Sequence, residues 1–92
     1  MTDEPFAVAW TPTAQRALRR LPEKVAAAVV EFCYGGLAAN PARVGHPLLL
    51  ELEGLHSARR GDYRVIYAID TDSRAVLIHD LAHRSDAYRP RG

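Results

Sequence analysis

Residues 54–70 read GLHSARRGDYRVIYAID, and they decide the fold class of this chain. The segment contains two strand-like runs, His56–Arg59 and Asp62–Asp70, separated by turn-forming residues. Side chains of a strand alternate between two faces, so one face would carry Tyr63, Val65, Tyr67 and Ile69 and the other Arg64, Ile66 and Ala68. We expect the bulkier set to pack against a second layer, which leaves Arg64 on an open sheet face.

Further strand signals lie on both sides of this segment. Residues 70–73 read DTDS, a turn sequence, so Tyr63–Ile69 is expected to form an antiparallel hairpin with Ala75–Leu81, inside a strand over Arg74–His83. Two more strands are expected at Phe6–Trp10, where β-forming residues alternate, and at Leu48–Glu53.

Two helices are predicted between the first strand and residue 40. Thr11-Pro12 supplies an N-cap and a first-turn proline for one helix, and Pro22-Glu23 opens the other. Gly35-Gly36 should weaken or bend the last turns of the second helix, which ends at Asn40-Pro41. The fold class is therefore α+β, a two-layer sandwich in which an antiparallel sheet of about four strands is backed by an N-terminal helical hairpin.

The composition indicates one globular domain over residues 1–92. Hydrophobic residues make up 48% and charged residues 25%, and a chain of 92 residues can bury only one core. The longest apolar run, residues 25–30, is much shorter than the roughly 20 residues that span a bilayer, so no membrane contact is expected. Asp3 and Glu4 stand where an export signal needs positive charge, and a single Cys33 fits a reducing compartment, so we expect a cytoplasmic protein.

The kind and placement of charge say more than the net charge of +1. Eleven of the twelve basic residues are Arg, whose planar fork of donors matches phosphate oxygens. The chain up to Ser57 carries a net charge of −1 and the remainder +2, so the basic character lies in the C-terminal third. A solvated charged face explains such a bias as well as a binding site does.

The segment at residues 54–70 resembles the G-L-x-S-x-R-x-G-D-Y-R-V-I-Y core of the RelE/ParE superfamily, and Ala82–Tyr88 resembles its H-R-x-D-x-Y ending. The likeness extends to the opening at Thr11–Pro22 and to a G-x-P-L element at Gly45–Leu48. This resemblance implies a RelE-like toxin of a type II toxin–antitoxin system, a ribosome-dependent mRNA endoribonuclease. Its implied partners are a small RelB-like antitoxin, the ribosome and mRNA, with operator DNA bound only through the antitoxin complex.

Four residues are expected to be catalytic: Arg64, Arg84, Tyr88 and His83. RNA cleavage by attack of a ribose 2′-hydroxyl on its own phosphate needs positive charge at phosphorus, which the guanidiniums of Arg64 and Arg84 could supply without a metal. Tyr88 matches the family tyrosine that stacks on a base or assists the attacking hydroxyl. His83 has a side chain suited to carrying a proton near neutral pH.

Four further residues are expected to contact RNA: Arg59, Arg60, His56 and His46. Each candidate also has a structural explanation, because Arg64 could pair with an aspartate across the sheet and a histidine could serve only packing. The histidines show no metal-ligand spacing, so neither a metal site nor a cofactor is expected.

The stretch around the G-x-P-L element departs from the family pattern. Relatives commonly carry basic residues there, whereas this chain has His46 and the run Leu48–Leu50, and Leu48 stands where some relatives place a glutamate base. The general acid and base are therefore left open. Two alternatives also stay open: a ParE-like inhibitor of DNA gyrase that performs no chemistry, and a decayed toxin that only binds antitoxin as a corepressor.

Overall fold

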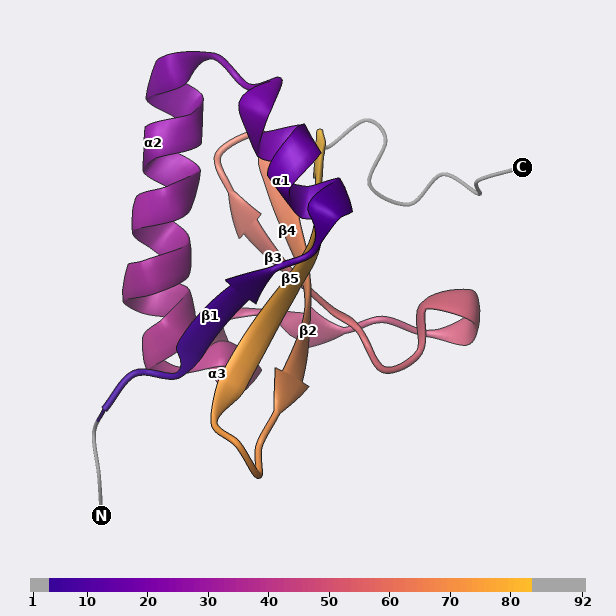
Figure 1. The fold of residues 1–92 in the computed structure, drawn as a ribbon. Coiled ribbons are helices and arrows are strands. Elements are labelled where there is room, and N and C mark those ends of the chain that lie inside the picture. The colour runs from indigo at the N-terminus through magenta and orange to yellow at the C-terminus, as the bar shows by residue number, and fades with distance from the viewer. Residues whose placement is uncertain (1–3, 84–92) are drawn as a thin grey trace.

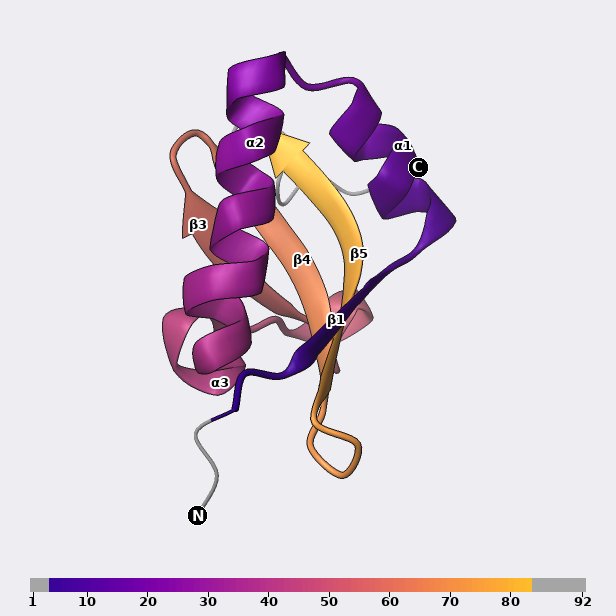
Figure 2. The ribbon, with the colours of Figure 1, turned by 60° about the vertical axis from the view of Figure 1, so that its left-hand side comes forward.

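The computed structural model describes residues 4–83 and shows a five-stranded sheet with helices on one face (Figures 1 and 2). The strands lie in the order β1-β5-β4-β3-β2. Their bounds are β1 Ala7–Trp10, β2 His46–Pro47, β3 His56–Arg60, β4 Tyr63–Asp70 and β5 Ala75–His83. The predicted α+β sandwich and the β4–β5 hairpin are confirmed, but the sheet is not wholly antiparallel, because β1 pairs with β5 in parallel.

The helical layer consists of α1 Pro12–Arg19, α2 Glu23–Phe32 and a short α3 Pro41–Val44. Thr11 caps α1 as expected, because its hydroxyl accepts from the backbone N–H of Ala14 at 3.1 Å. Between α2 and α3 the chain forms a π-helical segment, η1 Cys33–Leu37, which contains both Gly35 and Gly36. The predicted irregularity in the last turns of the second helix is therefore present. None of the helices within residues 4–83 is both long and apolar enough to cross a membrane.

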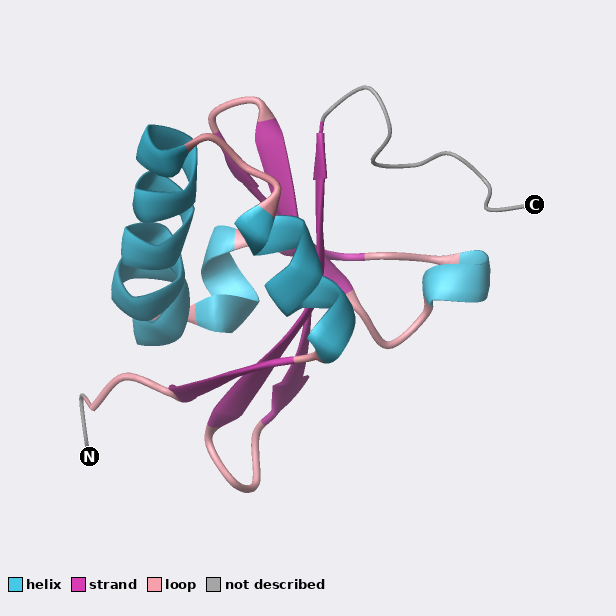
Figure 3. Cartoon of the chain, turned by 45° about the horizontal axis from the view of Figure 1, so that its top comes forward, coloured by secondary structure: helices cyan, strands magenta, loops and turns pink. Residues whose placement is uncertain are grey.

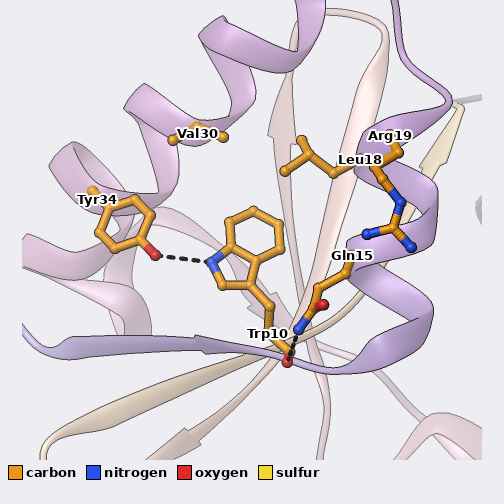
Figure 4. A pocket seen from close by; sticks show the side chains of 6 residues that line it. All are labelled: Trp10, Gln15, Leu18, Arg19, Val30 and Tyr34. Atoms are coloured by element: carbon orange, nitrogen blue, oxygen red, sulfur yellow. Dashed lines mark hydrogen bonds between the residues drawn. The ribbon is translucent and has the colours of Figure 1, made fainter.

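The predicted helical hairpin is not confirmed. The indole of Trp10, from the end of β1, lies between α1 and α2, with Leu18 on one side and Val30 on the other (Figure 4). Its Nε1 donates to the hydroxyl of Tyr34 at 3.0 Å, and a hollow of about 300 Å³ remains around the ring. A side chain of the sheet thus lies between the two helices.

The core lies between the sheet and the helices. Val65 and Tyr67 of β4 are fully buried and meet Val29, Cys33 and Leu37 from the helical layer. This arrangement confirms that the bulkier set of β4 faces the helices. Arg64 and Ile66 therefore point to the opposite face, which the helices leave open.

A register shift interrupts the pairing of β4 with β5. Ile66 lies opposite Asp80 and Tyr67 lies opposite Ile78, so His79 is an extra residue in β5. The carbonyl of His79 accepts a hydrogen bond of 3.0 Å from the Thr11 hydroxyl at the start of α1. This bulge reverses the alternation of β5, so that Leu81 faces the core whereas Asp80 and Ala82 face the open side.

The strand predicted at Leu48–Glu53 is wrong. β2 comprises only His46–Pro47, and the chain then forms a loop that contains a 3-10 helix, η2 Leu50–Leu52. Leu48 is buried, but Leu49 and Leu50 are 76% and 89% exposed, so the apolar residues in this run do not form one buried row. The loop stands away from the sheet (Figure 3), and its backbone closes on itself where the N–H of Leu48 donates to the carbonyl of Leu55.

Two buried side chains that ionise only at high pH, a thiol and a phenol, predict that the protein loses stability in alkali. Burial raises the pKa of Cys33 from 9.0 to about 12 and that of Tyr67 from 10.0 to about 12. The folded chain then keeps protons that the unfolded chain releases, so the free energy of unfolding falls as pH rises from about 9 towards 12. Thermal melts across this range should show a falling Tm, with a weaker fall in Tyr67→Phe. A Tm that stays level up to pH 11 would contradict the burial of these groups.

Candidate functional site

The open sheet face carries two arginines directly opposite each other. Arg59 of β3 pairs with Arg64 of β4, and Ala82 of β5 completes the row. Arg64 is half-buried, and its Nε atom is fully buried. Arg59 is exposed, and its Nε donates to the carbonyl of Gly61 at 3.4 Å. We call Arg59 and Arg64 the arginine pair.

Two guanidinium forks on one sheet face can hold the oxygens of a phosphate from two directions. Ala82, beside Arg64 in the same row, is buried. The arginine pair therefore suits a phosphodiester lying across β3 and β4.

The next row of the open face carries a carboxylate that the sequence reasoning did not place in the site. Asp80 lies opposite Ile66, one row from Arg64, and its Oδ1 accepts from the backbone N–H of Leu81 at 2.8 Å. His46 is exposed and lies in the same row, because it pairs with Ser57, which pairs with Ile66. Simple alternation along β5 would have put Asp80 beneath the helices with Ile78, and only the bulge at His79 turns it outward.

His83 does not share a face with the arginine pair. It lies opposite Tyr63, which pairs with Arg60, and this row follows the alternation of the core residues Val65 and Leu81. The rings of Tyr63 and His83 meet edge to face with centroids 5.3 Å apart. His83 and Arg60 thus lie on the helix side of the sheet.

His56 is also on the helix side. Its ring stacks on the buried ring of Tyr67, with centroids 5.5 Å apart and planes inclined by 27°. Its Nδ1 atom is buried and, among residues 4–83, has no hydrogen-bond partner. Of the eight residues singled out from the sequence, the open face brings together Arg59, Arg64 and His46. Arg84 and Tyr88 lie outside the described residues.

The described part of the chain contains no group of three or more His, Cys, Asp or Glu residues able to hold a metal ion. The pKa of Asp70 is lowered, mainly because Ser73 donates hydrogen bonds to its carboxylate. That contact stabilises the turn between β4 and β5 and lies outside the arginine pair.

Comparison with known proteins agrees with this fold. Residues 8–88 match the model of the ParE toxin of type II toxin–antitoxin systems, parDE. Toxin RelE of Mycobacterium tuberculosis is 61% identical over 87 residues, covering 95% of this chain and 90% of the relative. Toxin RelG of the same organism is 51% identical over 85 residues, covering 92% and 98%. The crystal structure of the M. tuberculosis toxin–antitoxin complex RelBE2 matches with a TM-score of 0.84 and 49% identity, covering 88% of this chain and all of that one.

The fold and these likenesses together define a toxin of the type II toxin–antitoxin class. Within that class, the chain belongs to the RelE/ParE family.

Proposed function

We propose that this toxin acts in the cytoplasm by cutting mRNA on the ribosome, and that it needs no metal. The observation that carries the proposal is the arginine pair on the open face, in a chain 61% identical to a RelE toxin. In this reaction the ribose 2′-oxygen attacks the adjacent phosphorus and the bond to the 5′-oxygen of the next nucleotide breaks. The proton of the 2′-hydroxyl is taken up, and another is given to the leaving oxygen.

In this proposal Arg64 stabilises the negative charge that gathers on the phosphate oxygens, and Arg59 holds the RNA backbone beside it. Arg84 and Tyr88 are assigned from the sequence motif, Arg84 to the same phosphate and Tyr88 to base stacking or to the 2′-hydroxyl. His46 is a histidine on the face where RNA would lie. Because His83 lies on the other face, its role as proton carrier requires an RNA path that reaches beyond the open face.

We also propose a RelB-like antitoxin as partner, because the similar M. tuberculosis protein was crystallised as a toxin–antitoxin complex. Expression of this chain alone should arrest bacterial growth, and co-expression of a small protein encoded beside it should restore growth. Growth that continues normally in several hosts would favour the decayed toxin instead.

The same expression experiment separates chemistry from contact inhibition. We expect new mRNA ends within translated codons, at positions in frame with the ribosome, and normal supercoiling by purified gyrase. Loss of gyrase activity with intact mRNA would show a ParE-like inhibitor. Zinc or manganese retained in stoichiometric amount after dialysis of the purified protein would contradict a metal-free reaction.

A further inference from the structure

A second hollow lies on the helix side of the sheet, between the start of α2 and the β3–β4 turn. It has a volume of about 240 Å³, with Lys24 and Arg60 at its margin and Val25, Ala28 and Tyr63 in its wall. Lys24 and Arg60 are both exposed. We call it the Lys24–Arg60 hollow. It combines two cations with an apolar and aromatic wall, which are the two elements that hold one nucleotide of a single strand.

The size of the hollow limits what it can hold. Pockets for drug-sized ligands usually enclose about 300–1,000 Å³, so about 240 Å³ leaves room for a single base-sized group. Asp62 also lines the hollow, and its carboxylate opposes a phosphate there. An anionic group would therefore sit near Lys24 and Arg60, and affinity should rise when Asp62 is neutralised.

The hollow and the arginine pair lie on opposite sides of one strand. Arg59 and Arg60 are consecutive in β3, so their side chains point to opposite faces. β2 pairs only with His56 and Ser57, so among the described residues the remaining part of β3, residues 58–60, forms an edge of the sheet. A polyanion can pass around this edge from one face to the other.

The charge distribution supports binding at this end of the molecule. The α1–α2 connection, the β3–β4 turn and the end of β5 lie at one end of the fold, and the β4–β5 turn lies at the other (Figures 1 and 2). The first end carries Arg19, Arg20, Lys24, Arg60 and His83 against Glu23 and Asp62, whereas the end at the β4–β5 turn carries Asp70 and Asp72 against Arg74. Although the net charge of the chain is only +1, the end with the α1–α2 connection and the β3–β4 turn is basic and attracts polyanions.

We propose that the Lys24–Arg60 hollow binds one nucleotide of an RNA strand that passes around the β3 edge, with its phosphate between the two cations and its base against Tyr63. The inference rests on the proposed function in taking RNA as the partner. It assigns Arg60 and Lys24 to binding, and leaves cleavage to the arginine pair. The strand could be the far part of the mRNA or a segment of ribosomal RNA.

Binding of two probes tests this site: a fluorescent single-stranded RNA of mixed sequence and purified bacterial 70S ribosomes, each titrated at several salt concentrations. Arg60→Ala and Lys24→Ala should each weaken binding about tenfold, as expected for losing one charge-assisted contact. Each should also reduce the slope of log K against log salt by about 0.7. Asp62→Asn should tighten binding, and Arg43→Ala, which removes an exposed arginine of α3, should change neither quantity.

The outcomes separate the two RNA sources and the two proposals. A loss seen with both probes supports the mRNA strand, and a loss seen only with ribosomes supports ribosomal RNA. If Arg60→Ala and Lys24→Ala both bind the RNA and the ribosomes as tightly as the parent does, the hollow is not an RNA site. The same conclusion follows if the two variants lose only antitoxin binding. Arg64→Ala should keep most of its RNA affinity and lose cleavage, whereas Arg60→Ala should recover cleavage at saturating protein. A parent protein that binds neither probe would overturn the proposed function together with this inference.

Discussion

Replacing Arg64 by Ala is expected to abolish growth arrest and mRNA cleavage while the protein still folds and binds its antitoxin. The loss of one preorganised charge at a transition state typically lowers a rate by about 10²–10³, roughly 3–4 kcal/mol. Arg64 lies on the face opposite the core but is half-buried, so its removal should lower the free energy of unfolding by about 1–2 kcal/mol. Cleavage in a cell-free translation system and a thermal melt of the same preparation measure the two effects.

Arg64→Lys refines this test, because it keeps the charge and loses the planar fork. Partial activity would indicate general electrostatic stabilisation, and complete loss would indicate bidentate contact with the scissile phosphate. A folded and fully toxic Arg64→Ala would remove Arg64 from the catalytic site. A variant that melts far below the parent would instead show that Arg64 serves the fold.

Replacing Gly45 by Ala is expected to destabilise the protein by about 3 kcal/mol, from overpacking together with the disturbance of a buried hydrogen bond. A Cβ at this position would overlap the hydroxyl of Tyr67 and lie 2.6 Å from the carbonyl oxygen of Ser57. The Tyr67 hydroxyl donates to the carbonyl of Pro41 at 2.6 Å and cannot move without losing this bond. Gly45 has a φ of −119°, which any residue can adopt, so the cost arises from space.

Gly35→Ala is the matched control, because no atom lies within 4 Å of a Cβ added there. Alanine in this helical segment should be neutral or stabilise by up to about 1 kcal/mol. Urea unfolding of both variants gives the comparison. If Gly45→Ala were as stable as the parent, the chain that follows α3 would have to move away from β3 easily enough to make room for the added methyl group.

The elements that could be predicted from the sequence are those whose pattern is local. Alternation in β4 placed Val65 and Tyr67 in the core and Arg64 outside, and the turn at residues 70–73 gave the hairpin. The parallel pairing of β1 with β5 could not be read in this way, because it depends on residues that meet only in the folded chain. The run Leu48–Leu50 led to the wrong prediction of a strand, because apolar composition alone does not show whether side chains are buried.

The candidate site could also be predicted from the sequence only in part. The motif identified Arg59 and Arg64, which the sheet register does bring together. His83 was assigned to the site and Asp80 was left out of it without knowledge of the bulge at His79, which exchanges the faces of all later residues in β5 up to His83. A one-residue irregularity thus decides whether a side chain lies beside the arginine pair or beneath the helices.

The pairing of the first strand with the last sets the time at which the sheet can be completed. Thr11 and His79, which meet where β1 leads into α1, are 68 residues apart in sequence. At about 5–20 residues per second, a ribosome needs roughly 3–14 s to synthesise the intervening chain. Contacts between such distant segments also form late in folding, because a long loop must close first. The nascent chain therefore exposes β1 and α1 for seconds before the sheet that carries the arginine pair is complete.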